Sequence, residues 1–315
     1  MGVELSVVIP AYNEEESVGP LYKELHEVLS ALGKTYEIIF VDDGSTDATF
    51  ERLRALHERD SAVRIVKFRS NFGQSAAMKA GFDHAGGEVV VTMDADLQND
   101  PYDIPKLLEK MEADDLDVVC GWRYNRHDPF SKKVFSKFAN SLRKVLTHET
   151  IHDSGCTLRA YRRECVKGLE LYGELHRYIP AMLLWKGYHI GELETNHRDR
   201  SFGRSKYNWA RLVKGFLDLL VITFWQRYSV RPMHVFGGAG LVMSGIGLAL
   251  ALYLGISRLF LQTELTDRPL FLVALVLLVV GVQFLALGII ADILLKVYYG
   301  QNGRKPYLRE TVLEN

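Results

Sequence analysis

The chain has 315 residues, 24% of them charged, and a formal net charge of −1. This balance gives no general attraction to nucleic acid, which excludes a nucleic-acid partner. The three cysteines show no C-x-x-C spacing, which is typical of reduced thiols in a cytosol-facing protein and excludes a disulfide scaffold. The first apolar run, 5–9, lacks a basic segment before it and is too short for a signal peptide.

The N-terminal part of the chain alternates between apolar β-branched runs and amphipathic segments. Such alternation is typical of β-α-β units, so we predict an α/β, Rossmann-like fold with a mostly parallel, doubly wound sheet. The predicted strands are 5–10, 36–41, 63–68, 89–93 and 117–120, and the predicted helices are 17–32, 46–59, 75–84 and 103–113.

Polar segments follow three of these strands: PAYNE at 10–14, DDGS at 42–45 and DADLQ at 94–98. We expect all three at the carboxyl edge of the sheet, where open α/β sheets bind ligands. Acidic groups gathered there repel one another unless a cation or a donor-rich ligand lies among them. A nucleotide diphosphate with its metal meets that need. Alternatively, Asp43 or Ser45 caps the helix expected to begin near residue 46.

The DADLQ segment carries two carboxylates and an amide at alternate positions. In an extended backbone Asp94, Asp96 and Gln98 project to the same side. Oxygen ligands of this kind suit Mg²⁺ or Mn²⁺. The simpler interpretation is a polar turn, since the D-x-D pattern recurs at 115–117 without any sign of a metal site. No dinucleotide or P-loop glycine motif is present.

The middle of the chain is basic. Arg123 follows the fifth predicted strand and should lie at the same sheet edge. The segment 129–146, which includes Lys132, is amphipathic and predicts either a helix on an anionic membrane surface or an ordinary solvated helix. The glycine-containing loop 198–207 is crowded with arginines, and guanidinium groups bind phosphate oxygens in pairs.

Two uncharged apolar runs, 235–254 and 270–291, are each long enough to cross a bilayer. Basic residues flank the pair, so we expect a multi-pass protein of the cytoplasmic membrane with both termini in the cytosol. Several glycines in the first run would allow close helix packing, within one chain or in a homo-oligomer. The expected organisation is a catalytic domain at 1–206, an amphipathic juxtamembrane helix at 207–230, two transmembrane helices within 231–298 and a cytosolic tail at 299–315.

The ordered motifs VVIPAYNEE, VDDGSTD, NFGQSAAMKAGF, DADLQNDP, GCTLRAYRR and FGRSKY resemble those of membrane-anchored polyprenol-phosphate glycosyltransferases. These are family 2 enzymes of GT-A fold, related to dolichol-phosphate mannose synthase. The chain resembles most the bacterial undecaprenyl-phosphate branch, whose members transfer glucose or 4-deoxy-4-formamido-arabinose. The resemblance implies inverting transfer from a nucleotide-diphosphate sugar, with UDP favoured over GDP, to undecaprenyl or dolichyl phosphate, with Mg²⁺ or Mn²⁺.

The same resemblance implies roles for individual residues. Pro10, Tyr12, Glu14, Asp42, Asp94 and Gln98 would bind the nucleotide sugar, and Asp94, Asp96 and Gln98 the metal. Arg123, Lys132, Arg159, Ser205 and Lys206 would bind donor or acceptor phosphates. Asp96, Asp153 and Arg200 would be catalytic.

The role of Asp153 stays open between a general base and an orienting group, because a phosphate monoester is mostly ionised near neutral pH and needs no strong base. Two rival functions differ in testable ways. A processive polysaccharide synthase would carry Q-x-x-R-W, whereas residues 225–228 read WQRY. A non-catalytic partner in glycolipid assembly would not need the acidic sheet edge.

Overall fold

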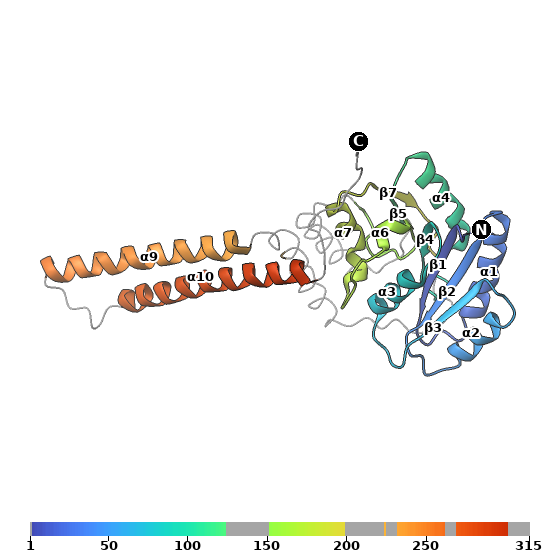
Figure 1. The fold of residues 1–315 in the computed structure, drawn as a ribbon, viewed down its shortest axis with the longest axis horizontal. Helices are drawn as coiled ribbons and strands as arrows, with labels where there is room; N and C mark the ends of the chain where they lie inside the picture. The colour runs from blue at the N-terminus through green and yellow to red at the C-terminus, as the bar shows by residue number, and fades with distance from the viewer. Residues whose placement is uncertain (1, 124–150, 199–223, 225–231, 262–268, 302–315) are drawn as a thin grey trace. The chain divides into compact units, whose positions relative to one another are not determined.

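The computed structural model describes residues 2–123, 151–198, 224, 232–261 and 269–301. The chain divides into two compact units, Met1–Leu219 and Leu220–Asn315, which are described separately. Figure 1 shows the strands within the first unit and two long helices in the second.

A seven-stranded sheet in the order β3-β2-β1-β4-β6-β5-β7 forms the first unit. All neighbouring strands pair in parallel except β6, which is antiparallel to both β4 and β5. The predicted mostly parallel, doubly wound sheet is therefore confirmed. Its strands are β1 (Leu5–Ala11), β2 (Tyr36–Asp42), β3 (Val63–Lys67), β4 (Val89–Thr92), β5 (Val118–Trp122), β6 (Arg159–Arg162) and β7 (Ile190–Glu194).

Helices cover both faces of this sheet (Figure 1). Alternate residues of β1 divide between two cores: Val7 and Ile9 pack with α1 and α4, whereas Val8 faces α3, where a side chain on Gly81 would collide with it. The helices are α1 (Val18–Ala31), α2 (Thr49–His57), α3 (Gln74–His84), α4 (Ile104–Ala113), α6 (Arg163–Val166) and α7 (Ile179–Trp185), with 3₁₀ turns η1 (Pro101–Asp103) and η2 (Leu175–Tyr178).

The start of α2 corrects one expectation. The helix begins at Thr49 rather than near residue 46, and Asp47 accepts the Thr49 amide at 3.0 Å. The prediction that Asp43 or Ser45 caps this helix is therefore wrong. The Ser45 hydroxyl instead accepts a hydrogen bond from the backbone N–H of Asn13 at 3.0 Å, which connects the polar loops that follow β1 and β2.

The second unit contains α9 (Pro232–Leu261) and α10 (Pro269–Gln301). Both are long and apolar enough to cross a membrane, with mean hydropathies of 2.0 and 2.9 over their candidate spans. A Cβ on Gly240 would lie 2.6 Å from the carbonyl oxygen of Gly281, so this glycine lets the two helices of one chain approach closely. A Cβ on Gly245 would meet nothing within 4 Å.

Candidate active site

The site lies where the order of strands reverses. β1 pairs with β2 on one side, with Ala11 opposite Asp42, and with β4 on the other, with Val8 opposite Thr92. The chain runs from β1 through β2 to β3 in one direction and then places β4 on the opposite side of β1. The crevice at such a switch point is where open α/β sheets bind ligands. The expected gathering of segments 10–14, 42–45 and 94–98 at one edge is confirmed.

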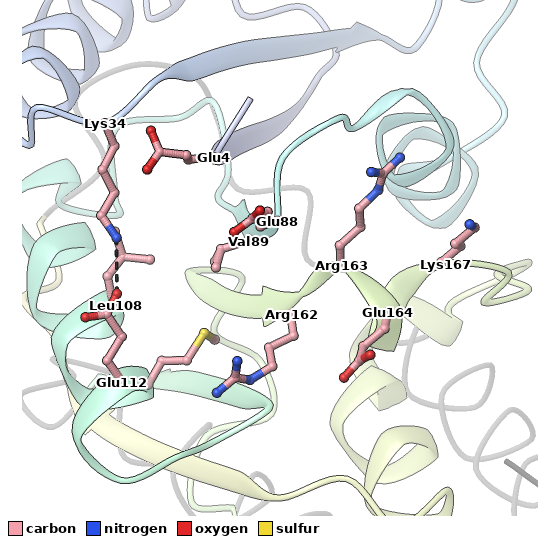
Figure 2. Close-up of a pocket in the computed structure, with 11 residues that line it drawn as sticks. Glu4, Lys34, Glu88, Val89, Leu108, Glu112, Arg162, Arg163, Glu164 and Lys167 are labelled. Carbon is pink, nitrogen blue, oxygen red and sulfur yellow. Dashed lines mark hydrogen bonds and ion pairs between the residues drawn. The ribbon is translucent and has the colours of Figure 1, made fainter. Parts of the chain in front are cut away.

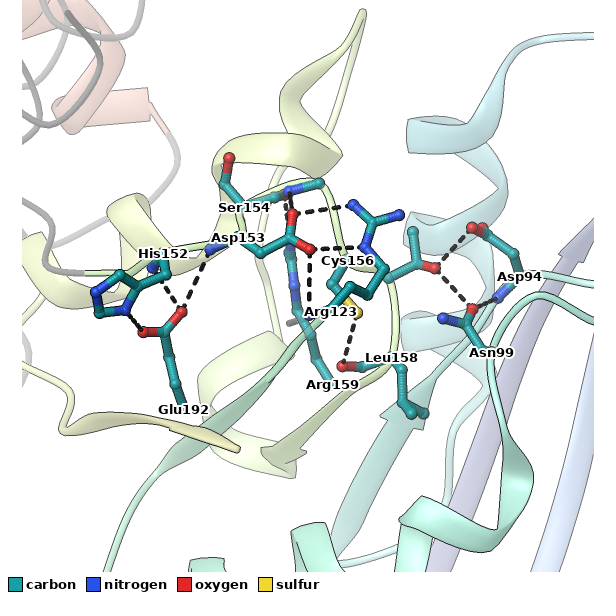
Figure 3. Close-up of polar contacts among 12 residues, drawn as sticks. Asp94, Asn99, Arg123, His152, Asp153, Ser154, Cys156, Leu158, Arg159 and Glu192 are labelled. Atoms are coloured by element: carbon teal, nitrogen blue, oxygen red, sulfur yellow. Dashed lines mark hydrogen bonds and ion pairs between the residues drawn. The ribbon is translucent and has the colours of Figure 1, made fainter. Parts of the chain in front are cut away.

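Asp94 is held by groups from three parts of the fold. Its Oδ1 accepts a hydrogen bond from the side-chain NH₂ of Gln74 at 2.7 Å, and its Oδ2 accepts one from the hydroxyl of Thr157 at 2.7 Å. Its own backbone N–H donates to Asn99 Oδ1 at 3.0 Å, as Figure 3 shows. Burial and the neighbouring Asp96 carboxylate raise the pKa of Asp94 to about 6.

The turn after β4 keeps an alternating pattern. Asp94, Asp96 and Gln98 are half-buried, whereas Ala95 and Leu97 between them are buried. Leu97 has a left-handed backbone with φ of 64°, and the Asp96 carboxylate accepts the Gln98 amide at 3.2 Å, so the turn is tight. This alternation agrees with the expectation that the three polar side chains share one side.

These residues suit a divalent cation that takes further ligands from substrate. Among the described residues, no group of three or more His, Cys, Asp or Glu side chains is placed to hold a metal. Asp94 and Asp96 would therefore supply two carboxylates, and Mg²⁺ or Mn²⁺ bound in this way completes its shell with water and phosphate oxygens. Burial is the main cause of the raised pKa of Asp94, and the neighbouring Asp96 carboxylate adds to it; a bound cation would favour the ionised form of both groups.

Asp42 ends β2 and is fully buried. Its Oδ1 accepts the amide of Ser45 at 2.9 Å. Its Oδ2 is buried and has no hydrogen-bond partner within the described part of the chain. Buried polar atoms in folded proteins are almost always paired, so this oxygen is suited to accept an N–H or O–H donor from a ligand.

Asp43, the residue after Asp42, has a structural function. Its two oxygens accept the amides of Phe72 at 2.7 Å and Gly73 at 2.9 Å, which fixes the loop that leads into α3. Burial and the adjacent Asp42 raise its pKa above the ordinary range. The two neighbouring carboxylates therefore differ: both oxygens of Asp43 accept hydrogen bonds from the protein, whereas one oxygen of Asp42 has no partner among the described residues.

Pro10, Tyr12 and Glu14 lie at the carboxyl end of β1 and just beyond it, and all three are half-buried. The Glu14 carboxylate accepts the Ser17 hydroxyl at 2.8 Å, and its amide donates to Thr49 at 2.8 Å. The structure therefore brings these three residues to the same edge as Asp42 and Asp94.

Arg123 and Asp153 form a pair beside this edge (Figure 3). Arg123 Nε lies 2.6 Å from Asp153 Oδ2 and Nη2 lies 2.9 Å from Oδ1. Burial alone would lower the pKa of Arg123, but the hydrogen bonds and charge of Asp153 raise it above its ordinary value. The arginine charge in turn partly offsets the raised pKa of Asp94, so both belong to one electrostatic site.

A second group, absent from the sequence predictions, supports Asp153. The ring of His152 stacks on Trp122 with centroids 4.6 Å apart, and its Nδ1 lies 2.7 Å from Glu192 on β7. These contacts fix the chain just before Asp153. Trp122 and Glu192 lie 30 and 40 positions from His152 in the sequence. No motif connects them, so no signal for this cluster was present in the sequence.

Arg159, for which a phosphate contact is predicted, is buried, and its Nε has no hydrogen-bond partner within the described residues, so that contact stays a prediction. The residue is 2% exposed, and its guanidinium donates to the backbone carbonyls of Ser154 at 2.6 Å and His176 at 3.3 Å. Its position on the antiparallel strand β6, which the sequence did not predict, explains this inward orientation. The predicted roles of Lys132, Arg200, Ser205 and Lys206 lie outside the described residues.

A separate pocket of about 540 Å³ opens at the opposite edge of the sheet (Figure 2). Its lining includes Glu4 and Val89 near the starts of β1 and β4, and Arg162 at the end of β6. Acidic and basic side chains are mixed there, and Lys34 pairs with Glu112 at 3.1 Å. The pocket is therefore not part of the site around Asp94.

The chain is similar in sequence to known glycosyltransferases. The sequence family described as glycosyl transferase family 2 matches residues 6–169. A dodecaprenyl-phosphate galacturonate synthase of Rhizobium johnstonii is 41% identical to this chain, over 99% of this chain and 94% of the relative. An undecaprenyl-phosphate 4-deoxy-4-formamido-L-arabinose transferase of Salmonella paratyphi B is 34% identical, over 98% and 94% respectively.

Among solved structures, glucosyl-3-phosphoglycerate synthase from Mycobacterium tuberculosis, crystallised with Mn²⁺, UDP and phosphoglyceric acid, is similar with a TM-score of 0.54. It is 20% identical, covering 71% of this chain and 78% of that chain. The same enzyme without those ligands in its description gives a TM-score of 0.54 at 21% identity, over 70% and 80%. This likeness confirms the GT-A type of fold that the motifs predicted.

Proposed function

The chain belongs to glycosyl transferase family 2, and we propose that it transfers a sugar from a nucleotide-diphosphate sugar to a polyprenyl phosphate. Relatives aligned along almost the whole chain carry names of dodecaprenyl- and undecaprenyl-phosphate sugar transferases. In the reaction, an oxygen of the lipid phosphate forms a bond to the anomeric carbon from the side opposite the leaving group. The bond from that carbon to the nucleoside diphosphate breaks, and the configuration is inverted.

The donor half of the site is the crevice between β1, β2 and β4. The unpaired Oδ2 of Asp42 supports a role in accepting a donor group of the nucleotide. Pro10, Tyr12 and Glu14 line the same edge and would contact the nucleotide beside it. UDP is the nucleotide favoured here over GDP.

A divalent cation, Mg²⁺ or Mn²⁺, would be held by Asp94 and Asp96, with Gln98 beside them. The cation supplies charge neutralisation for the leaving diphosphate. The protein prepares for it by fixing Asp94 through Gln74 and Thr157, so the carboxylate does not have to be reoriented when substrate arrives.

The acceptor half lies around Arg123. The second pKa of a phosphate monoester is about 6, so the acceptor is mostly a dianion near neutral pH. Its attack needs positioning rather than deprotonation. We assign Arg123 to the acceptor phosphate and Asp153 to the orientation of Arg123. Lys132, Arg200, Ser205 and Lys206 complete the proposed phosphate contacts on motif evidence alone.

The two apolar helices α9 and α10 would bring the enzyme to its lipid substrate. As two membrane spans, they would return the chain to the side from which it entered, and the basic residues that flank the pair support a cytosolic side for both termini. A cytosolic catalytic unit agrees with a nucleotide-sugar donor made in the cytosol.

The single observation that carries the proposed function is the hydrogen bond between Thr157 and Asp94. It joins the turn of residues 94–98, which we call the metal turn, to the segment 153–157. That segment also carries Asp153, the partner of Arg123. This bond supports the proposal that donor and acceptor groups are held on one frame, as in-line transfer between two anionic reactants requires.

The test is a donor panel with the purified full-length protein in detergent. UDP-linked galacturonate, 4-deoxy-4-formamido-L-arabinose and glucose are each incubated with undecaprenyl phosphate and dolichyl phosphate, with Mn²⁺ or Mg²⁺. Mass spectrometry should detect one polyprenyl-phosphate sugar together with release of UDP. An Asp94→Asn variant is the matched control. Absence of any sugar-lipid across the panel and a matching GDP-linked panel would favour a non-catalytic partner.

A further inference from the structure

The turn that carries Asp94 and Asp96 is strapped by a segment about 100 residues further along the chain. After β7, His197 forms an antiparallel bridge with Asn99. The amide of Arg198 donates to the carbonyl of Gln98 at 3.0 Å. The strap therefore contacts the backbone of the turn at Gln98 and Asn99.

Asp100 is the hub of these contacts. It is 8% exposed, and its Oδ1 accepts Arg198 Nη2 at 2.7 Å and the Tyr102 amide at 3.1 Å. Its Oδ2 accepts the side-chain amide of Asn196 at 3.0 Å. One nearly buried carboxylate thus joins the end of the metal turn to two residues of the strap.

Further bonds anchor the strap to the surrounding fold. The backbone N–H of Asn196 donates to Asp103 Oδ2 at 2.7 Å, at the start of α4. The second guanidinium nitrogen of Arg198 lies 2.7 Å from one oxygen of Glu24 on α1 and 3.0 Å from the other. Arg198 therefore connects Asp100 to a helix that packs in the main core.

The metal turn needs such external support. β4 ends at Thr92 and the next regular element, η1, begins at Pro101. Between them, strand-type contacts are the Met93–Val8 bond at one end and the Asn99–His197 bridge of the strap at the other, so Asp94 to Gln98 lie outside regular elements. Leu97 also has a left-handed backbone, which costs free energy for a non-glycine residue. Two carboxylates of like charge held close together tend to separate unless the backbone prevents it.

We propose that Asp100, acting through Arg198 and Asn196, is a positioning residue that holds Asp94 and Asp96 ready for the divalent cation. It touches neither substrate nor metal. The role rests on the proposed function of the metal turn. Groups that orient metal-ligating carboxylates from outside typically change metal affinity by about 10–100-fold when they are removed.

The test compares full-length Asp100→Asn and Arg198→Lys with wild type in detergent. Asparagine keeps the size of Asp100 but loses the charge that holds Arg198, and lysine lacks the planar fork that bridges two carboxylates. Matched controls are Asp83→Asn and Arg54→Lys, whose ion pairs lie on exposed helix surfaces.

Two readouts are measured for every variant. Hydrogen–deuterium exchange of peptides covering 94–103 reports the turn itself, without substrate or metal. Sugar transfer over a Mn²⁺ titration gives the half-saturating Mn²⁺ concentration and kcat. In both site variants we expect faster exchange and a half-saturating Mn²⁺ raised about 10–100-fold, with kcat at saturating Mn²⁺ within about twofold of wild type. The controls should match wild type.

The results separate the two hypotheses. If wild-type transfer does not respond to added or chelated divalent metal, the metal role of Asp94 and Asp96 fails and the positioning role with it. If wild type responds but Asp100→Asn shows wild-type exchange and Mn²⁺ dependence, only the role of Asp100 is overturned. A fall in kcat with an unchanged Mn²⁺ dependence also overturns it, because a positioning residue for the metal must act on metal affinity.

Discussion

Arg123 and Asp153 are joined by two parallel hydrogen bonds, Nε to Oδ2 at 2.6 Å and Nη2 to Oδ1 at 2.9 Å, and the two side chains are 13% and 12% exposed. A carboxylate engaged in this way by a guanidinium is stabilised in its ionised form and is a poor proton acceptor. The sequence left Asp153 open between a base and an orienting group. The pairing supports the orienting role.

Replacing Asp153 should therefore weaken transfer without abolishing it. Asp153→Asn keeps one oxygen acceptor for Arg123, and we expect about 1–10% of wild-type turnover. Asp94→Ala and Asp96→Ala should lose nearly all turnover because each removes a proposed metal carboxylate. The measurement is the initial rate of sugar-lipid formation, with Asp115→Asn, which alters an exposed ion pair with Arg162, as the control. Equal and complete loss in all three site variants would contradict the orienting role.

Asp42→Asn tests the unpaired oxygen. One side-chain oxygen can still accept the Ser45 amide, but an NH₂ group then replaces Oδ2 and faces the donor group of the nucleotide. Leaving two donors opposed costs about 1–3 kcal/mol, or roughly 10–100-fold in nucleotide affinity. Binding of the nucleoside diphosphate, measured by calorimetry, should fall by that factor. Unchanged affinity would place the nucleotide elsewhere.

The pH dependence of metal binding follows from Asp94. Its pKa of about 6 in the metal-free protein means that a proton competes with the cation below that pH. The half-saturating Mn²⁺ concentration should be constant above pH 7 and should rise toward tenfold for each unit below pH 6. A flat profile from pH 5 to 7.5 would show that Asp94 does not titrate as the metal site requires.

The same pKa shift predicts that the ionised Asp94 carboxylate lowers the free energy of unfolding of the metal-free protein. Because the folded protein binds the Asp94 proton more tightly than the unfolded chain, this group lowers stability as the pH rises through about 4 to 6, and its full cost is present at pH 7. In the metal-free protein, the melting temperature of Asp94→Asn minus that of wild type should therefore rise by about 2–4 °C between pH 4 and pH 7. The effect of the side-chain NH₂ group on the hydrogen bonds to Gln74 and Thr157 is the same at both pH values and cancels in this comparison. Thermal unfolding with EDTA checks this, and a difference that does not change with pH would contradict it.

Two glycines of α9 give a matched test of helix packing. A side chain at Gly240 would lie 2.6 Å from the carbonyl oxygen of Gly281, whereas Gly245 has nothing within 4 Å. Gly240→Leu should separate α9 from α10 at a cost of about 1–3 kcal/mol, and Gly245→Leu should be neutral. Thermal stability of the full-length protein in detergent distinguishes them. Equal effects would mean that the two helices do not use this contact.

Strands β1 to β4 were predictable because each is a mainly apolar run followed by an amphipathic helix. β7 pairs in parallel with β5 but was not predicted, since its sequence IGELE is only half-buried. β6 was not predictable, since Arg159–Arg162 reads as a basic segment. Arg159 is buried because the carbonyls of Ser154 and of the more distant His176 accept its guanidinium, whereas Arg162 stays partly exposed and pairs with Asp115, 47 positions away. Such partners have no trace in local periodicity.

The candidate site shows the same division. Asp42 and Asp94 could be assigned from the sequence because each directly follows a strand, and strand ends meet at one edge. The partners of these residues could not be assigned: Thr157 lies 63 positions from Asp94, and Asp100 meets Arg198 98 positions away. Side-chain pairing across such distances depends on the final packing of the fold.

The antiparallel direction of β6 limits how this enzyme can be recombined with its relatives. Because β6 starts at the carboxyl edge, the chain just before it delivers Thr157 onto Asp94 and Asp153 onto Arg123. A hybrid joined anywhere between 94 and 157 would combine halves that did not evolve as partners. A hybrid that exchanges the turn of Asp94 between homologues should therefore move residues 74–162 as one block.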